Sequence, residues 1–148
     1  MRNAFSMITA IFIIVFMATV AMFVLSLSGK NVKATTTQYQ RAQAMLYAKS
    51  YTEFAIMAVT AHARTSNCVD KIEGSIDDID EGGYNIETHI SYIGPTSEIT
   101  NCTNKLSTNV TTTSTPLTLI IDAYVDYKDL DNTTGPVLTV HRRTVQKI

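Results

Sequence analysis

Few residues in the first half of this sequence would interrupt a helix. Only three of the 148 residues are proline, six are glycine and none is tryptophan, and the first proline is Pro95. Charge is sparse as well: 12 Lys and Arg against 13 Asp and Glu give a formal net charge of -1. A chain without a positive field of its own is not expected to bind nucleic acid. Its length suits one modest domain plus an anchor.

Motifs for catalysis and for tight metal binding are also missing. There is no Gly-x-Ser-x-Gly and no phosphate-binding loop, so we expect no enzyme activity. His62, His89 and His141 are too scattered to suggest a metal site. The acidic stretches at residues 77–83 and 126–132 could offer oxygen ligands to calcium, but neither matches a full calcium-binding loop. We therefore expect solvated loops and no cofactor, with calcium as the alternative.

The most prominent feature of the sequence is an apolar run near its start, ITAIFIIVFMATVAMFVLSL, at residues 8–27. The run contains no charge, proline or glycine and is long enough to cross a bilayer, which takes about 20 residues. Its Ile, Leu, Val and Phe residues favour membrane insertion by about 4 to 7 kcal/mol. A secretory signal has a shorter core of about 7–15 residues, so we expect this segment to be kept as an anchor. Arg2, Lys30 and Lys33 do not fix its orientation.

The helical pattern continues beyond the apolar run. Large apolar residues recur at helical spacing at Val32, Tyr39, Leu46 and Phe54, which predicts a single helix from about Phe5 to Ala63. Smaller or flexible residues fill the same stripe, namely Ala42, Met45, Ala58 and Ala61. We expect this stripe to face the rest of the protein.

The start of the chain resembles the type IV pilins and the pseudopilins of type II secretion. The resemblance lies in a short basic leader, MRNA, followed by FSMITA at the start of a long apolar helix that becomes amphipathic, and it extends to about Arg64. It implies that a prepilin peptidase cuts between Ala4 and Phe5 and that the new amine of Phe5 is methylated. It also implies a single-pass protein of the bacterial inner membrane, with its C-terminal domain outside the cytoplasm and with incorporation into a pilus or pseudopilus. Its expected partners are membrane lipid, an assembly platform and other subunits, contacted through the N-terminal helix.

The sequence departs from this family at two positions. Most members carry glycine where this chain has Ala4, and most carry a glutamate where it has Thr9. That glutamate is thought to neutralise the amine of a neighbouring subunit during assembly, which a threonine cannot do. The hydroxyl of Thr9 can instead bond to a carbonyl one turn earlier. The resemblance therefore points to a minor pilin or pseudopilin rather than to the bulk fibre subunit.

From Ser66 onward the pattern alternates, as in half-buried strands. YNIETHISYI places every second residue from Tyr84 to Tyr92 on one face, and LTLIIDAYVDY does the same for every second residue from Leu117 to Tyr127. Residues 137–146 suit an outer strand. We expect an α+β fold, in which the long helix is packed on an antiparallel sheet of three or four strands. The predicted segments are a leader at 1–4, a membrane and assembly helix at 5–28, its amphipathic continuation at 29–64 and a β-rich domain at 65–148.

The sequence has two cysteines, Cys68 and Cys102. For a domain outside the cytoplasm we expect a disulfide, worth about 4 kcal/mol in the chain-entropy model; two free thiols are the alternative. The Thr-rich stretch at residues 101–118 predicts an exposed loop, and its triplets at Asn101 and Asn109, with a third at Asn132, are formal glycosylation acceptors. This stretch motivates a competing interpretation, a membrane-anchored binding module or adhesin. A plain single-span protein with an uncut N-terminus also remains open.

Overall fold

The chain begins with one long helix, α1, from Arg2 to Ala61 in the computed structural model. The structure describes residues 2–63, 67–108, 117–132 and 134–148, with side chains described from residue 7 onward. These residues form two compact units, which we call the N-terminal unit (Met1–Gln38) and the C-terminal unit (Tyr39–Ile148). The described residues of the N-terminal unit all belong to α1. The helix predicted from about Phe5 is therefore confirmed, and it ends two residues before the predicted Ala63.

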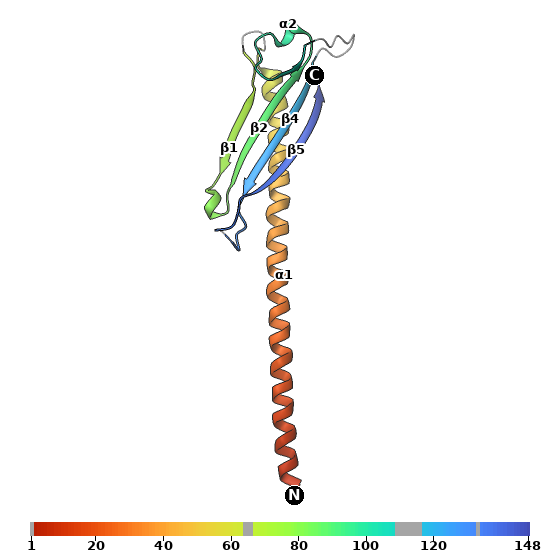
Figure 1. Ribbon diagram of the computed structural model, residues 1–148, viewed down its shortest axis with the longest axis vertical. Helices are drawn as coiled ribbons and strands as arrows, with labels where there is room; N and C mark the ends of the chain where they lie inside the picture. Colours follow the sequence, from red (N-terminus) through yellow and green to blue (C-terminus); the bar gives the residue numbers. More distant parts are fainter. Residues whose placement is uncertain (1, 64–66, 109–116, 133) are drawn as a thin grey trace. The chain divides into compact units, whose positions relative to one another are not determined.

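The C-terminal unit combines the last turns of α1 with a five-stranded sheet (Figure 1). The strands are β1 (Lys71–Ile76), β2 (Tyr84–Ile93), β3 (Lys105–Ser107), β4 (Thr118–Tyr127) and β5 (Leu138–Lys147). Two short helices, η1 (Ile79–Glu81) and α2 (Thr96–Ile99), lie in the connections. The strand order is β1-β2-β4-β5, and each neighbouring pair in this order is antiparallel. β3 pairs in parallel with the end of β2.

The α+β fold and the three expected strands are confirmed. Two strands were not predicted: β1, and β3, which lies inside the stretch expected to be a loop. Alternation along β2 and β4 also behaves as predicted. The buried residues that alternate along each strand form one face of the sheet: Tyr84, Ile86, Thr88, Ile90 and Tyr92 on β2, and Leu119, Ile121, Ala123, Val125 and Tyr127 on β4.

The face of α1 that meets this sheet is not the predicted stripe. Leu46 is 65% exposed and Phe54 is 50% exposed. The buried face recurs every three or four residues through smaller or polar side chains, namely Gln40, Ala44, Ala48, Thr52, Ala55 and Val59. The prediction was wrong because it placed the largest apolar side chains of the helix against the sheet. The sheet supplies the bulk of the core through its tyrosines, isoleucines and leucines, so the helix must present small residues for its backbone to come close.

Two contacts show how closely helix and sheet approach. A Cβ added at Gly74 of β1 would lie 1.9 Å from the hydroxyl oxygen of Tyr51 on α1, so glycine makes room for the tyrosine ring. Gln40 is 2% exposed and holds the connection after β4. Its Nε2 donates to the carbonyl of Lys128 at 3.0 Å, and its Oε1 accepts from the N–H of Leu130 at 3.4 Å.

Candidate functional site

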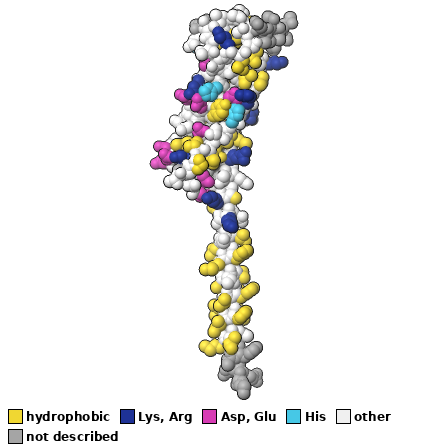
Figure 2. Space-filling view, in the orientation of Figure 1, with side chains coloured by type: hydrophobic (Ala, Val, Ile, Leu, Met, Phe, Trp, Pro, Cys, Tyr) yellow, Lys and Arg dark blue, Asp and Glu magenta, His cyan; other side chains and the backbone are white. Residues whose placement is uncertain are grey.

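The N-terminal unit is a helix whose surface is mainly apolar over residues 7–27. Every described side chain from Met7 to Thr35 is exposed, and apolar side chains dominate residues 7–27 (Figure 2). Such a surface is stable only in lipid or against other apolar surfaces. By length and composition α1 contains one candidate membrane span near the N-terminus.

The residues predicted for processing and assembly lie at the start of this helix. The backbones of Ala4 and Phe5 belong to α1, but their side chains lie outside the described part, so cleavage and methylation there remain predictions. Thr9 is exposed, and its expected bond to a carbonyl one turn earlier also stays a prediction. Thr19 of the same apolar run makes a bond of this type, donating from Oγ1 to the carbonyl of Phe16 at 2.8 Å.

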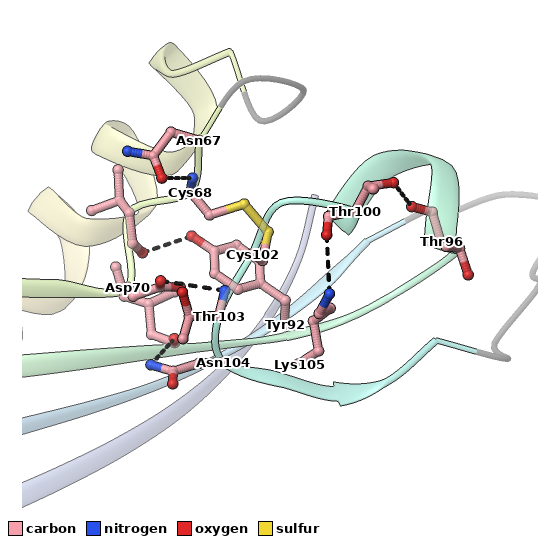
Figure 3. Close-up of a disulfide and its surroundings, with 12 residues drawn as sticks. Asn67, Cys68, Asp70, Tyr92, Thr96, Thr100, Cys102, Thr103, Asn104 and Lys105 are labelled. Atoms are coloured by element: carbon pink, nitrogen blue, oxygen red, sulfur yellow. Dashed lines mark hydrogen bonds between the residues drawn. A yellow bond between two sulfur atoms is a disulfide. The ribbon is translucent and has the colours of Figure 1, made fainter.

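The structure joins Cys68 and Cys102 in a disulfide, with their Cα atoms 4.9 Å apart (Figure 3). Both cysteines are buried in the same apolar cluster as Val59 and Tyr92. The hydroxyl of Tyr92 donates to the carbonyl of Val69 at 2.7 Å. The disulfide therefore ties the chain just after α1 to the loop that follows α2, next to the end of β2.

The solvent-facing side of the sheet carries an ion cluster that the sequence did not predict. Asp122 of β4 is 9% exposed and accepts from Nε and Nη2 of Arg143 on β5, at 2.7 and 2.9 Å. Nε2 of His141 lies 2.7 Å from the same carboxylate. The hydrogen bonds from Arg143 hold the pKa of Asp122 below its usual value, aided by His141 and opposed by burial.

A second group lies beside the first on the same side of the sheet. Nζ of Lys71 on β1 lies 2.6 Å from Oε1 of Glu87 on β2, and Nε2 of His89 lies 2.8 Å from the same oxygen. The bond from Lys71 lowers the pKa of Glu87. Tyr124 lies between the two groups. Its ring stacks on the ring of His141, with the ring centroids 4.5 Å apart, and it is in a T-shaped contact with the ring of His89, with the centroids 5.9 Å apart. These groups cross-link neighbouring strands.

Sequence alternation could have placed Asp122, Tyr124 and His89 on the outer side, because they alternate with buried positions. It could not show which residues of β5 lie opposite them. That depends on the register, which pairs Asp122 with Arg143 and Tyr124 with His141.

The calcium alternative gains no support from the described parts of the chain. Across residues 2–63, 67–108, 117–132 and 134–148, no three His, Cys, Asp or Glu residues converge as metal ligands. In the acidic turn before β2, Asp78 accepts from the N–H of Asp80 at 2.9 Å, and Asp80 pairs with Lys128. Asn101 and Asn132 lie in exposed turns. Asn109 and the rest of residues 109–116 lie outside the described residues.

Comparison with known proteins adds no relative. No protein-family model matches the chain. No curated protein and no solved structure is significantly similar to it either. The resemblance to pilins therefore rests on the residues of the N-terminal segment.

Proposed function

We propose that this protein is a minor pilin or pseudopilin, a single-span membrane subunit that helps to start assembly of a type IV pilus or a type II secretion pseudopilus. The observation that carries the proposal is the N-terminal sequence MRNAFSMITA. The four residues MRNA, the last of them the small Ala4, precede a stretch of α1 whose side chains are mostly apolar and all exposed from Met7 to Leu27.

The exposed apolar surface of residues 7–27 supports two successive environments for the same helix. In the bilayer its side chains face lipid, and its backbone groups are satisfied within the helix. In a fibre the same side chains pack against the helices of neighbouring subunits. Lipid is as apolar as a leucine side chain, so the exchange depends on close packing between helices rather than on the hydrophobic effect.

Thr9 supports a low-copy role. In a low-dielectric setting the attraction between a carboxylate and a neighbouring amine is much stronger than in water. A shaft subunit gains from such a pairing with each new neighbour, and Thr9 cannot provide it. A subunit near the tip, with no subunit beyond it, has no need of the acid.

The disulfide supports export of the C-terminal unit. Disulfides persist in oxidising compartments and are rare in the cytosol, and the Cys68–Cys102 bond lies in the small unit that would need it. We place this unit outside the cytoplasm, on the far side of the bacterial inner membrane. The proposed partners of the protein are prepilin peptidase, the assembly platform and other subunits, the last contacted through the N-terminal helix.

Quantitative mass spectrometry of sheared fibres from the native host tests this role. We expect this chain in the fibre fraction at far below the amount of the major subunit. We also expect that Thr9→Ala leaves fibre formation nearly normal, because only a local backbone bond is lost. If the chain is the most abundant fibre protein, the tip role is wrong. If it stays in the membrane fraction under conditions that produce fibres, the competing interpretation as an anchored binding module is favoured.

A further inference from the structure

We propose that the free edge of β5 binds an extended acidic segment of a partner protein, which adds to the sheet as a further strand. β5 lies at one end of the sheet order and is ten residues long (Figure 1). Among the described residues no strand pairs with its outer side. This surface belongs to the C-terminal unit and is independent of the N-terminal helix on which the proposed function rests.

One hydrogen bond shows which backbone groups of β5 point to the free edge. The N–H of Ile148 donates to the carbonyl of Leu117 at 3.0 Å, which continues the ladder that pairs Lys147 with Thr118. Hydrogen-bonded and non-hydrogen-bonded pairs alternate along an antiparallel ladder. The even-numbered residues of β5 therefore bond to β4. The odd-numbered residues turn their N–H and C=O groups outward: Thr139, His141, Arg143, Val145 and Lys147.

The charge on β5 selects the kind of strand that can dock. The strand contains Arg142, Arg143 and Lys147 and no acidic residue. Arg143 is engaged by Asp122. Arg142 and Lys147 are exposed and form no ion pair with any residue that the structure describes. Dark blue side chains lie along the side of the C-terminal unit that carries β5 (Figure 2). Oppositely charged pairs across neighbouring strands are stabilising, so an acidic strand fits this edge.

The same charges disfavour a second copy of this chain. Antiparallel pairing of two β5 strands through their outward groups has two registers of greatest overlap. One places Arg142 of each copy opposite Arg142 of the other, and the other places Arg143 opposite Arg143. Like charges directly opposite each other are destabilising, and charged side chains are a common protection of sheet edges against self-pairing. The edge is thus protected against its own copies and remains open to an acidic segment, which would also cover the exposed side chain of Val145.

A peptide-binding experiment on the full-length protein in zwitterionic detergent tests the proposal. The probe is a fluorescein-labelled nine-residue peptide of alternating Glu and Val, and the control peptide alternates Lys and Val. We expect the acidic peptide to raise fluorescence anisotropy at concentrations at which the basic peptide has no effect, and added salt to weaken the binding. Hydrogen exchange then locates the contact. The peptide should slow exchange of the N–H groups of residues 139, 141, 143, 145 and 147, and leave the even-numbered amides of β5 unchanged.

Two variants with matched controls separate docking from folding. Val145→Pro removes an outward N–H and no ladder bond, a position that proline tolerates on an edge strand. We expect an unchanged unfolding temperature and about tenfold weaker peptide binding. Lys147→Glu should weaken binding by about threefold or more, whereas Lys49→Glu, the same charge change on α1, should not.

Three outcomes would overturn the proposal. The first is equal binding of the acidic and basic peptides. The second is an absence of protection at the odd-numbered amides when the acidic peptide is bound. The third is concentration-dependent protection of those amides without peptide, which would make a second copy the occupant. If Val145→Pro does not fold, the proposal is still tested in two ways. One is the difference in peptide binding between Lys147→Glu and Lys49→Glu, and the other is the exchange pattern of the unmodified protein.

Discussion

Asp122 and Arg143 face each other across β4 and β5, and both carboxylate oxygens of Asp122 accept hydrogen bonds from the guanidinium group. Arg143 is largely solvent-exposed while Asp122 is nearly buried. The pair therefore cross-links β5, the last strand of the sheet, to β4. Because solvent screens the exposed Arg143, the carboxylate of Asp122 adds only about 1 kcal/mol to the free energy of unfolding through this pair.

The pH dependence of stability follows from this pair. Because the folded-state pKa of Asp122 is lowered by Arg143, its stabilisation is present above the unfolded value of about 4 and is lost as the pH falls through the folded value. Asp122→Asn should lower stability by about 1 kcal/mol at pH 7, and by progressively less below about pH 4. Thermal unfolding from pH 7 to pH 2.5 measures this. Asp126→Asn, on the same strand and face with Thr139 as its partner, is the control. An equal loss for Asp122→Asn at pH 7 and pH 2.5 would contradict the account.

The observed packing of α1 predicts opposite effects on stability for an aspartate placed on its buried face and one placed on its exposed face. Ala48→Asp would bury an unpaired carboxylate against the sheet, because Ala48 is fully buried, and should unfold the C-terminal unit. Leu46→Asp places the same group on the exposed side and should change the free energy of unfolding by no more than about 0.5 kcal/mol. Limited proteolysis of full-length protein in detergent distinguishes them. Similar protease sensitivity in both variants would contradict the observed packing.

Thr88 offers a stabilising substitution. Its hydroxyl is fully buried in the middle of the sheet and has no hydrogen-bond partner among the described residues. Thr88→Val replaces this hydroxyl with a methyl group of similar size and should stabilise the fold by about 1 kcal/mol. Thr52→Val is the matched control. The Thr52 hydroxyl is equally buried but donates to the carbonyl of Ala48 at 2.7 Å, so its removal should bring no gain. Equal effects of the two substitutions on chemical denaturation would refute this explanation.

The disulfide should contribute strongly to so small a core. It closes a loop with a sequence separation of 34, for which the chain-entropy model gives about 4 kcal/mol. Replacing Cys68 and Cys102 together by serine should lower the unfolding temperature, and reductant should then have no further effect. Alkylation of protein taken from intact cells, followed by intact mass measurement, checks the oxidised state. Labelling of both thiols without reductant would contradict it.

Period-two alternation was sufficient to predict β2, β4 and β5, because each strand has one face that is clearly more apolar or more polar than the other. It was insufficient for β1, whose inward positions are Ile72, Gly74 and Ile76. A glycine in the middle of a strand reads as a break, and its use here becomes clear only once the ring of Tyr51 is seen beside it.

The buried side of α1 could not be read from side-chain size. The large residues Leu46 and Phe54 indicated one face, and the alanines at positions 44, 48 and 55 occupy the other. Which face is buried depends on how much volume the sheet already fills, and that is a property of the pairing of helix and sheet. The Asp122 cluster was missed for a related reason, because its members come together only through the register of β4 and β5.

The mass of the N-terminal peptide of protein isolated from its native membrane tests the central claim most directly. We expect a chain that starts at Phe5 with one added methyl group on its amine. We also expect that this processing is lost in cells lacking prepilin peptidase. A retained Met1 or Arg2 in cells with active prepilin peptidase would contradict the assignment, and so would a cut downstream of the apolar run.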